Sequence, residues 1–138
     1  MRRFAESEGG ASAVEFAIVG PVFILMLLGT LAFGLYIGVS HSVAQLSADA
    51  ARASIAGLDD AERASIARQY VERNASGFPL VDAGRITVEA GPAPTDSTAF
   101  RVVVSYDASS LPIWQLQNFL PLPEQTVKRV SVVRRGGE

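Results

Sequence analysis

The chain has 138 residues, of which 49% are hydrophobic, 14 are acidic and 12 are basic, and it contains no cysteine. This length suits one domain with an accessory segment and excludes a large multidomain enzyme. The net charge of −2 argues against a strongly basic nucleic-acid-binding surface, and the hydrophobic fraction argues against intrinsic disorder. Without cysteine there are no disulfides, which does not by itself indicate a compartment.

The hydrophobic residues are concentrated near the N-terminus. No Asp, Glu, Lys or Arg occurs from Phe16 to Val39, and this run, as a helix, would be roughly 36 Å long. That length crosses a hydrocarbon core of about 30 Å, and it exceeds the apolar part of a signal peptide. Arg2 and Arg3 precede the run and the next basic residue is Arg52, so the positive-inside rule places the N-terminus in the cytoplasm.

We therefore expect a single-pass protein of the cytoplasmic (inner) membrane, with its N-terminus inside. Three regions follow from this expectation. Residues 1–10 form a cytoplasmic leader, residues 11–40 a transmembrane helix, and residues 41–138 an extracytoplasmic head.

The first predicted helix is long. Ser12 and Glu15 have the S-x-x-E spacing of a capping box, which predicts that the helix begins at Ser12, after a pair of glycines. Beyond the apolar run the sequence becomes Ala-rich and amphipathic without a helix breaker, so we expect the helix to continue to about Ala56 and to end at Gly57. The apolar face of this second half consists of Val43, Leu46, Ala50 and Ala53.

Small residues recur every fourth position along the first helix. They are Thr30, Gly34, Gly38 and Ser42. Such a stripe allows another helix backbone to approach closely, although glycines are also common in membrane helices without any such role.

A second helix and three strands are predicted in the head. Asp59 and Glu62 indicate the start of the helix, which should end near Ser76 or Gly77. Apolar and polar residues then alternate over 85–90, 100–107 and 126–135, as is typical of strands, with a hairpin loop over 91–98. The expected fold class is α+β, with a small three-stranded antiparallel sheet packed on one or both helices.

The segment over 109–124, "SSLPIWQLQNFLPLPE", is unusually apolar for a connection. One interpretation is a flap that covers the open face of the sheet or packs on a helix. The other is an exposed surface for a protein partner, with Trp114 and Phe119 as its main contacts.

The sequence offers no clear catalytic or metal-binding pattern. His41 is the single histidine, at the point where the apolar run ends, and no cysteine accompanies it. The carboxylates of Asp59, Asp60 and Glu62 are explained by the start of the second helix. We therefore expect no enzyme activity, no metal and no cofactor.

Basic residues near the C-terminus do not indicate nucleic-acid binding. Lys128, Arg129, Arg134 and Arg135 are close in sequence, but from His41 onward 10 basic residues are balanced by 11 acidic ones. Charges on an edge strand discourage aggregation between sheets, which is the simpler explanation.

The stretch "GGASAVEFAIVGPVFILMLLGTLAFG" resembles the N-terminus of TadE-like proteins, the minor pseudopilins of tight-adherence (Flp-type) pilus systems. The shared features are a glycine, a few small residues, "VEFA" and an apolar run with a proline. In this chain they are Gly10, Ala11, Ala13, Val14, Glu15, Phe16, Ala17 and Pro21, and the likeness continues more loosely through the Ala-rich stretch at 48–53. Phe16 follows the glutamate where the major Flp pilins have tyrosine.

The resemblance implies a non-catalytic pseudopilin that takes part in the assembly of an adhesive pilus. A prepilin peptidase would cleave between Gly10 and Ala11, and Glu15 and Phe16 would act in assembly and recognition. The subunit would stay in the membrane until it joins or primes a pilus. Its other partners would be further pilins or pseudopilins and the inner-membrane assembly platform.

Two roles remain open for Glu15. It can be a carboxylate at a helix start, stabilised by the helix dipole and the capping box. Alternatively, it pairs at membrane depth with the new α-amine at Ala11 of a neighbouring subunit, which would remove an unpaired charge and fix the stagger between helices.

The alternative function for the whole chain is that of an uncleaved, single-pass envelope module whose α+β head binds a protein partner or ligand. Such a module has no need of Gly10 and Ala11 followed by Glu15 at this spacing. The state of the N-terminus therefore discriminates between the two functions.

Overall fold

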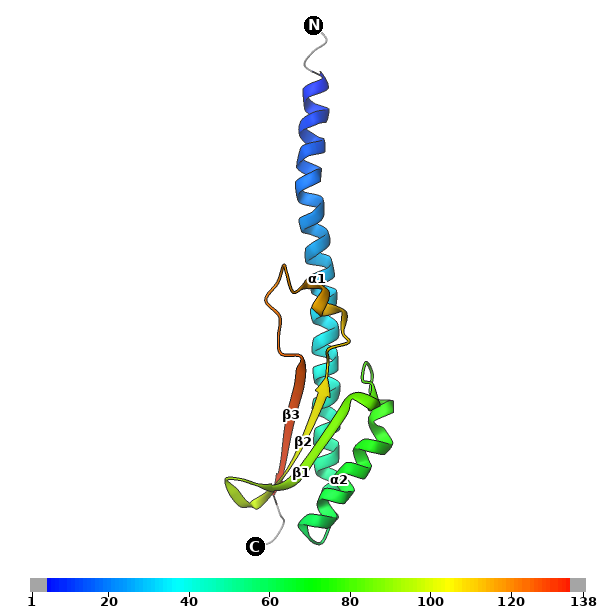
Figure 1. Ribbon diagram of the computed structural model, residues 1–138, viewed down its shortest axis with the longest axis vertical. Helices are drawn as coiled ribbons and strands as arrows, with labels where there is room; N and C mark the ends of the chain where they lie inside the picture. The colour runs from blue at the N-terminus through cyan, green and yellow to red at the C-terminus, as the bar shows by residue number, and fades with distance from the viewer. Residues whose placement is uncertain (1–4, 135–138) are drawn as a thin grey trace.

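The computed structural model describes the backbone of residues 5–134 and the side chains of residues 9–134. Its central element is the helix α1, Ala5–Ser54, whose 50 residues correspond to about 75 Å. Figure 1 shows its N-terminal half projecting away from the rest of the protein. Arg2 and Arg3, on which the predicted orientation depends, and Arg135 lie outside the described residues.

The predicted start of α1 at Ser12 is wrong, because the helix already includes Gly9 and Gly10. Ser12 is consequently an interior residue, and the S-x-x-E pattern does not cap the helix. A glycine costs a helix roughly 1 kcal/mol relative to alanine. With helix-forming residues on both sides, this local cost does not stop propagation.

The C-terminal end of α1 lies at Ser54, close to the predicted position. Gly57 follows, but no glycine in the described part of the chain has a positive φ, so Gly57 is not a left-handed cap. Its role is close approach, since a Cβ there would lie 2.7 Å from both the backbone nitrogen and Cγ of Arg63. The Arg63 Nε donates a hydrogen bond of 2.9 Å to the Gly57 carbonyl.

The second helix, α2, spans Asp60–Asn74 and is extended by the 3-10 turn η1, Ala75–Gly77. Asp59 caps it as predicted, accepting a hydrogen bond of 2.8 Å from the Glu62 backbone, while the Glu62 carboxylate accepts one of 2.7 Å from the Leu58 backbone. The buried face consists of Ala64, Ala67 and Val71, with Tyr70 half-buried.

Three antiparallel strands form one sheet in the order β1-β2-β3. They are β1, Ile86–Ala93, β2, Asp96–Asp107, and β3, Thr126–Arg134. A short 3-10 turn, η2, Ala83–Arg85, precedes β1. The α+β fold is therefore confirmed. The hairpin between β1 and β2 is tighter than the predicted loop over 91–98, because pairing continues to Ala93 with an irregularity after Pro92.

One face of the sheet packs against the helices. α1 contacts β2 and β3, whereas α2 contacts β1. The core between these layers includes Val39, Val43, Leu46, Ala50, Phe100, Val102, Val104 and Tyr106, so the predicted apolar face of α1 is largely confirmed. On the opposite face Val130 and Val132 remain more than half exposed.

Candidate functional site

Within residues 9–134 no three His, Cys, Asp or Glu side chains are grouped to hold a metal ion. The His41 ring is exposed on α1 and lies 3.3 Å from the Gln45 amide. A cleft of about 310 Å³ between α2 and β1 is lined by Arg68, Val71, Glu72, Ala75, Ala83, Ile86 and Val88. This lining is mainly apolar and includes one arginine and one glutamate.

The basic residues of β3 do not share one surface. Lys128 and Arg134 belong to the exposed face of the sheet, whereas Arg129 lies on the alternate face and its guanidinium donates a hydrogen bond to the Ser40 hydroxyl of α1. Strand alternation thus divides the cluster between two faces. Arg129 is exposed and links β3 to α1, on the other face of the sheet from Lys128 and Arg134.

The N-terminal half of α1 is apolar and exposed. Large side chains between residues 14 and 31 that are about half exposed or more are Val14, Phe16, Ile18, Val19, Val22, Phe23, Ile24, Met26, Leu27, Leu28 and Leu31. Only 11% of the most apolar 18-residue stretch of the helix is buried, and the helix is long enough to cross a membrane. A buried core helix would show the opposite, so this half requires an apolar environment outside the chain.

The predicted processing and assembly residues lie at the start of this exposed half. Gly10, Ala11 and Glu15 are exposed, and Phe16 is exposed at 77%. Nothing lies within 4 Å of the position of a Cβ on Gly10. Among the residues that the structure describes, no hydrogen bond or ion pair is made by the Glu15 carboxylate.

The apolar segment 109–124, which we call the strap, lies beside the middle of α1, where the exposed half meets the head (Figure 1). It contains the 3-10 turn η3, Pro112–Leu116, whose Ile113 side chain is completely buried. Further along, a Leu120 methyl group lies 3.2 Å from the position of a Cβ on Gly29. The strap therefore packs on the helix and not over the open face of the sheet. Phe119, however, is exposed at 67%.

Shallow apolar hollows lie between the strap and α1, and the two larger ones reach furthest along the helix. One, of about 420 Å³, is lined by Leu120 and by Val22, Leu25, Met26, Gly29, Thr30 and Phe33. The other, of about 520 Å³, is lined by Leu116, Phe119 and by Pro21, Val22, Ile24, Leu25 and Leu28. The strap thus reaches helix positions that lie well inside the apolar run.

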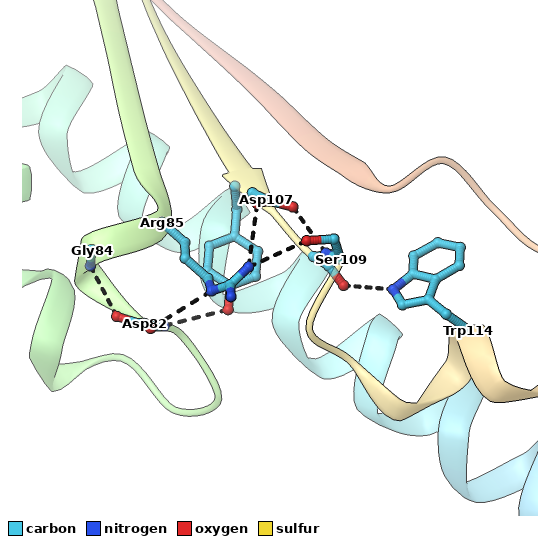
Figure 2. A network of polar contacts seen from close by, with 8 residues as sticks. Asp82, Gly84, Arg85, Asp107, Ser109 and Trp114 are labelled. Carbon is cyan, nitrogen blue, oxygen red and sulfur yellow. Dashed lines mark hydrogen bonds and ion pairs between the residues drawn. The ribbon is translucent and has the colours of Figure 1, made fainter.

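A polar network holds the first end of the strap (Figure 2). Arg85 donates to the Asp107 carboxylate at 3.2 Å and to the Ser109 hydroxyl at 3.3 Å, and lies 3.8 Å from Asp82. The Trp114 indole N–H donates to the Ala108 carbonyl at 2.7 Å. Trp114 is therefore half-buried and hydrogen-bonded within its own chain. The sequence alone left open whether it packs internally or contacts a partner.

The charge state of Asp107 is set by the same network. Hydrogen bonding from the Ser109 side chain, and then from the Ser109 backbone, lowers the pKa of Asp107 below its ordinary value, with a smaller lowering by the Arg85 charge. The carboxylate is therefore ionised and acts as an acceptor at neutral pH.

The small-residue stripe of α1 is used in two different ways. Near the head, the Ser42 hydroxyl donates a hydrogen bond of 2.8 Å to the Pro79 carbonyl, and a Leu80 methyl group lies 2.8 Å from the position of a Cβ on Gly38. The loop after α2 therefore occupies this half of the stripe. At Gly34 nothing lies within 4 Å of the position of a Cβ.

Comparison with known proteins gives one match. The family model of TadE-like protein matches residues 10–52, which begin at Gly10 and cover both the exposed and the amphipathic half of α1. No curated protein and no solved structure matches the chain. The exposed apolar helix and the family match together indicate single-pass membrane anchoring. The chain therefore shares its N-terminal segment with the TadE-like family, as the motif around Glu15 predicted.

Proposed function

We propose that this protein is a minor pseudopilin that a prepilin peptidase processes and that takes part in the assembly of a tight-adherence pilus. The observation that carries the proposal is the TadE-like match, which begins at Gly10 and covers a helix with an exposed apolar half. The family associates the chain with the Tad pilus as a structural component. Processing, orientation and the role in assembly are the proposed steps.

In this proposal the N-terminus lies in the cytoplasm and the α+β head lies outside the cytoplasmic membrane. The peptidase cleaves between Gly10 and Ala11, and the partners of the mature chain are other pilins or pseudopilins and the assembly platform. The scissile bond is helical and exposed. Because a peptidase cleft needs an extended backbone, the helix must open there. Gly9 and Gly10 lower the free-energy cost of this opening, since glycine stabilises a helix less than any residue except proline.

Glu15 has a defined role in this proposal. Its carboxylate is exposed on an apolar helix, and an unpaired carboxylate near hydrocarbon costs free energy. Cleavage creates an α-amine at Ala11, four residues away, on every mature subunit. Pairing Glu15 of one subunit with the α-amine of the next would neutralise both charges and set the axial offset between two helices.

The first experiment measures the N-terminus. The full chain is produced with and without the matching peptidase, and intact-mass analysis is expected to give Ala11 and Met1, respectively, as the first residue. Gly10→Leu should remain uncleaved, because its side chain would crowd the cleft, while membrane extraction should be unchanged. A chain that begins at Met1 in both samples would favour the uncleaved envelope module.

The second experiment separates processing from assembly. Glu15→Val should be inserted and cleaved, since Gly10 and Ala11 are untouched, but it should not co-purify with pilin partners or support pili in cells that lack the wild-type copy. Glu15→Asp, which retains the charge, is the control and should preserve most of the association. Normal pili with the Val variant would show that Glu15 has no pairing role.

A further inference from the structure

Tyr36 indicates where the membrane surface lies along α1, and therefore how deep the strap lies relative to that surface. About 20 helical residues cross a hydrocarbon core of about 30 Å, and 20 residues counted from Phe16 end at Leu35, immediately before Tyr36. Tyrosine is enriched at membrane interfaces. The membrane surface on the side of the head therefore lies near Tyr36, and Gly29, seven residues earlier, lies about 10 Å below that surface.

The strap has no charged residue below this level. The Tyr36 phenol donates a hydrogen bond to the carbonyl of Glu124, so the last residue of the strap is at the level of the surface. From Ala108 to Pro123 there is no charged residue. The apolar side chains of Leu116, Phe119 and Leu120 lie beside helix positions 21–33, which are below the surface.

An irregular segment in hydrocarbon must satisfy its backbone donors. In the strap, the N–H groups of Leu111, Trp114, Gln117, Phe119 and Leu120 donate to strap or Ala108 carbonyls. Pro112, Pro121 and Pro123 have no N–H group. Unpaired backbone N–H groups cost free energy in hydrocarbon and so keep loops out of lipid. Much of this cost is removed in the strap. The exposed amides of Gln117 and Asn118 limit the depth to the outer part of the leaflet.

From this geometry we propose that the strap is inserted into the membrane leaflet on the side of the head, with Phe119 in contact with lipid acyl chains. The protein is then held by a transmembrane helix and by a second, non-spanning segment that packs on it. A depth of about 10 Å is within the range known for interfacial segments. The inference depends on membrane anchoring and not on processing or on a role in pili.

The test uses the absence of cysteine in the chain. Phe119→Cys in the full chain is labelled with a nitroxide and reconstituted at low density in phosphatidylcholine vesicles. Collisions of the label with oxygen, which concentrates in lipid, are compared with collisions with a water-soluble nickel chelate. Leu27→Cys, an exposed position of α1, is the control for lipid, and Val130→Cys, an exposed apolar position of the sheet, is the control for water.

The expected result is an accessibility of the Phe119 label that resembles that of the Leu27 label, with oxygen favoured over the chelate. An accessibility like that of the Val130 label would overturn the proposal. A label that is immobile and reached by neither reagent would also overturn it, in favour of coverage by another protein chain. Phe119 is exposed, so its replacement should not disturb the fold.

Discussion

The phenol of Tyr36 on α1 donates a hydrogen bond of 3.0 Å to the carbonyl of Glu124, 88 residues further along the chain. This bond fixes the second end of the strap, as the network around Asp107 fixes the first. The strap is thus attached at both ends, to Arg85 of η2 at the first and to Tyr36 of α1 at the second. Each attachment can be removed separately, which makes its contribution measurable.

Tyr36→Phe should loosen the second end of the strap. Because the bond is exposed, we expect a loss in the free energy of unfolding of at most about 1 kcal/mol. Urea unfolding of the full chain in detergent, together with limited proteolysis within residues 117–125, measures both effects. Tyr70→Phe is the control, because this half-buried tyrosine lies between α2 and the core and away from the strap. Equal cleavage in both variants would contradict the role of Tyr36.

Gly57→Ala should destabilise the head. The new Cβ would lie 2.7 Å from the Arg63 backbone nitrogen, so the backbone between α1 and α2 has to move. Overpacking of this kind costs about 1–3 kcal/mol in the free energy of unfolding. Gly77→Ala, where nothing lies within 4 Å of the new Cβ, should change the unfolding midpoint little. Equal unfolding midpoints for the two variants would contradict a close contact between Gly57 and Arg63.

Acid should loosen the first end of the strap. The pKa of Asp107 is lowered in the folded protein, so its stabilising contribution is present above the unfolded value of about 3.9 and is lost as the pH falls through the lower folded value. The emission of Trp114, the single tryptophan, should shift in this acid range. Asp107→Asn should remove that shift.

Asp96→Asn serves as the control for the acid experiment. The pKa of Asp96 is also lowered, chiefly by hydrogen bonds from Thr98, but Asp96 lies at the hairpin between β1 and β2, far along the sheet from Asp107. The emission of Trp114 in this variant should titrate as in the parent chain. A loss of the shift in Asp96→Asn would mean that global unfolding, and not the strap, is being observed.

Gly9→Ala should slow the proposed cleavage although Gly9 is not part of the scissile bond. Alanine stabilises a helix by roughly 1 kcal/mol relative to glycine, which corresponds to about a fivefold lower population of the opened backbone. A time course of leader removal measures this rate. Gly34→Ala, a similar change 24 residues after the scissile bond, should be cleaved at the parental rate. An unchanged rate in Gly9→Ala would exclude helix opening as a rate-limiting step.

The elements that the sequence predicted well depend on local patterns. Asp59 and Glu62 cap α2 within a single turn, and alternation in β3 separates Val127 on the core face from the exposed Lys128 and Val130. The predicted start of α1 at Ser12 is wrong because the cost of two glycines is small against helix propagation from both sides.

The position of the strap could not be predicted in the same way. Its apolar residues follow no helical or strand period, and one of its contacts joins Leu120 to Gly29, 91 residues apart. Such a contact depends on where β2 ends and β3 begins relative to α1. The roles of Gly10, Ala11, Glu15 and Phe16, by contrast, come from the family motif and stay predictions, because a single chain includes neither the peptidase nor a second subunit.

The strap also gives α1 two unequal sides. Helix positions that line the hollows beside the strap are centred on Leu25, Gly29 and Ala32. Phe23, Leu27, Gly34 and Ile37 are exposed and, at about 100° per residue, project from the opposite side of the helix. The side of α1 at Gly29 is therefore covered by Leu120 of the strap, whereas the side at Gly34 stays open.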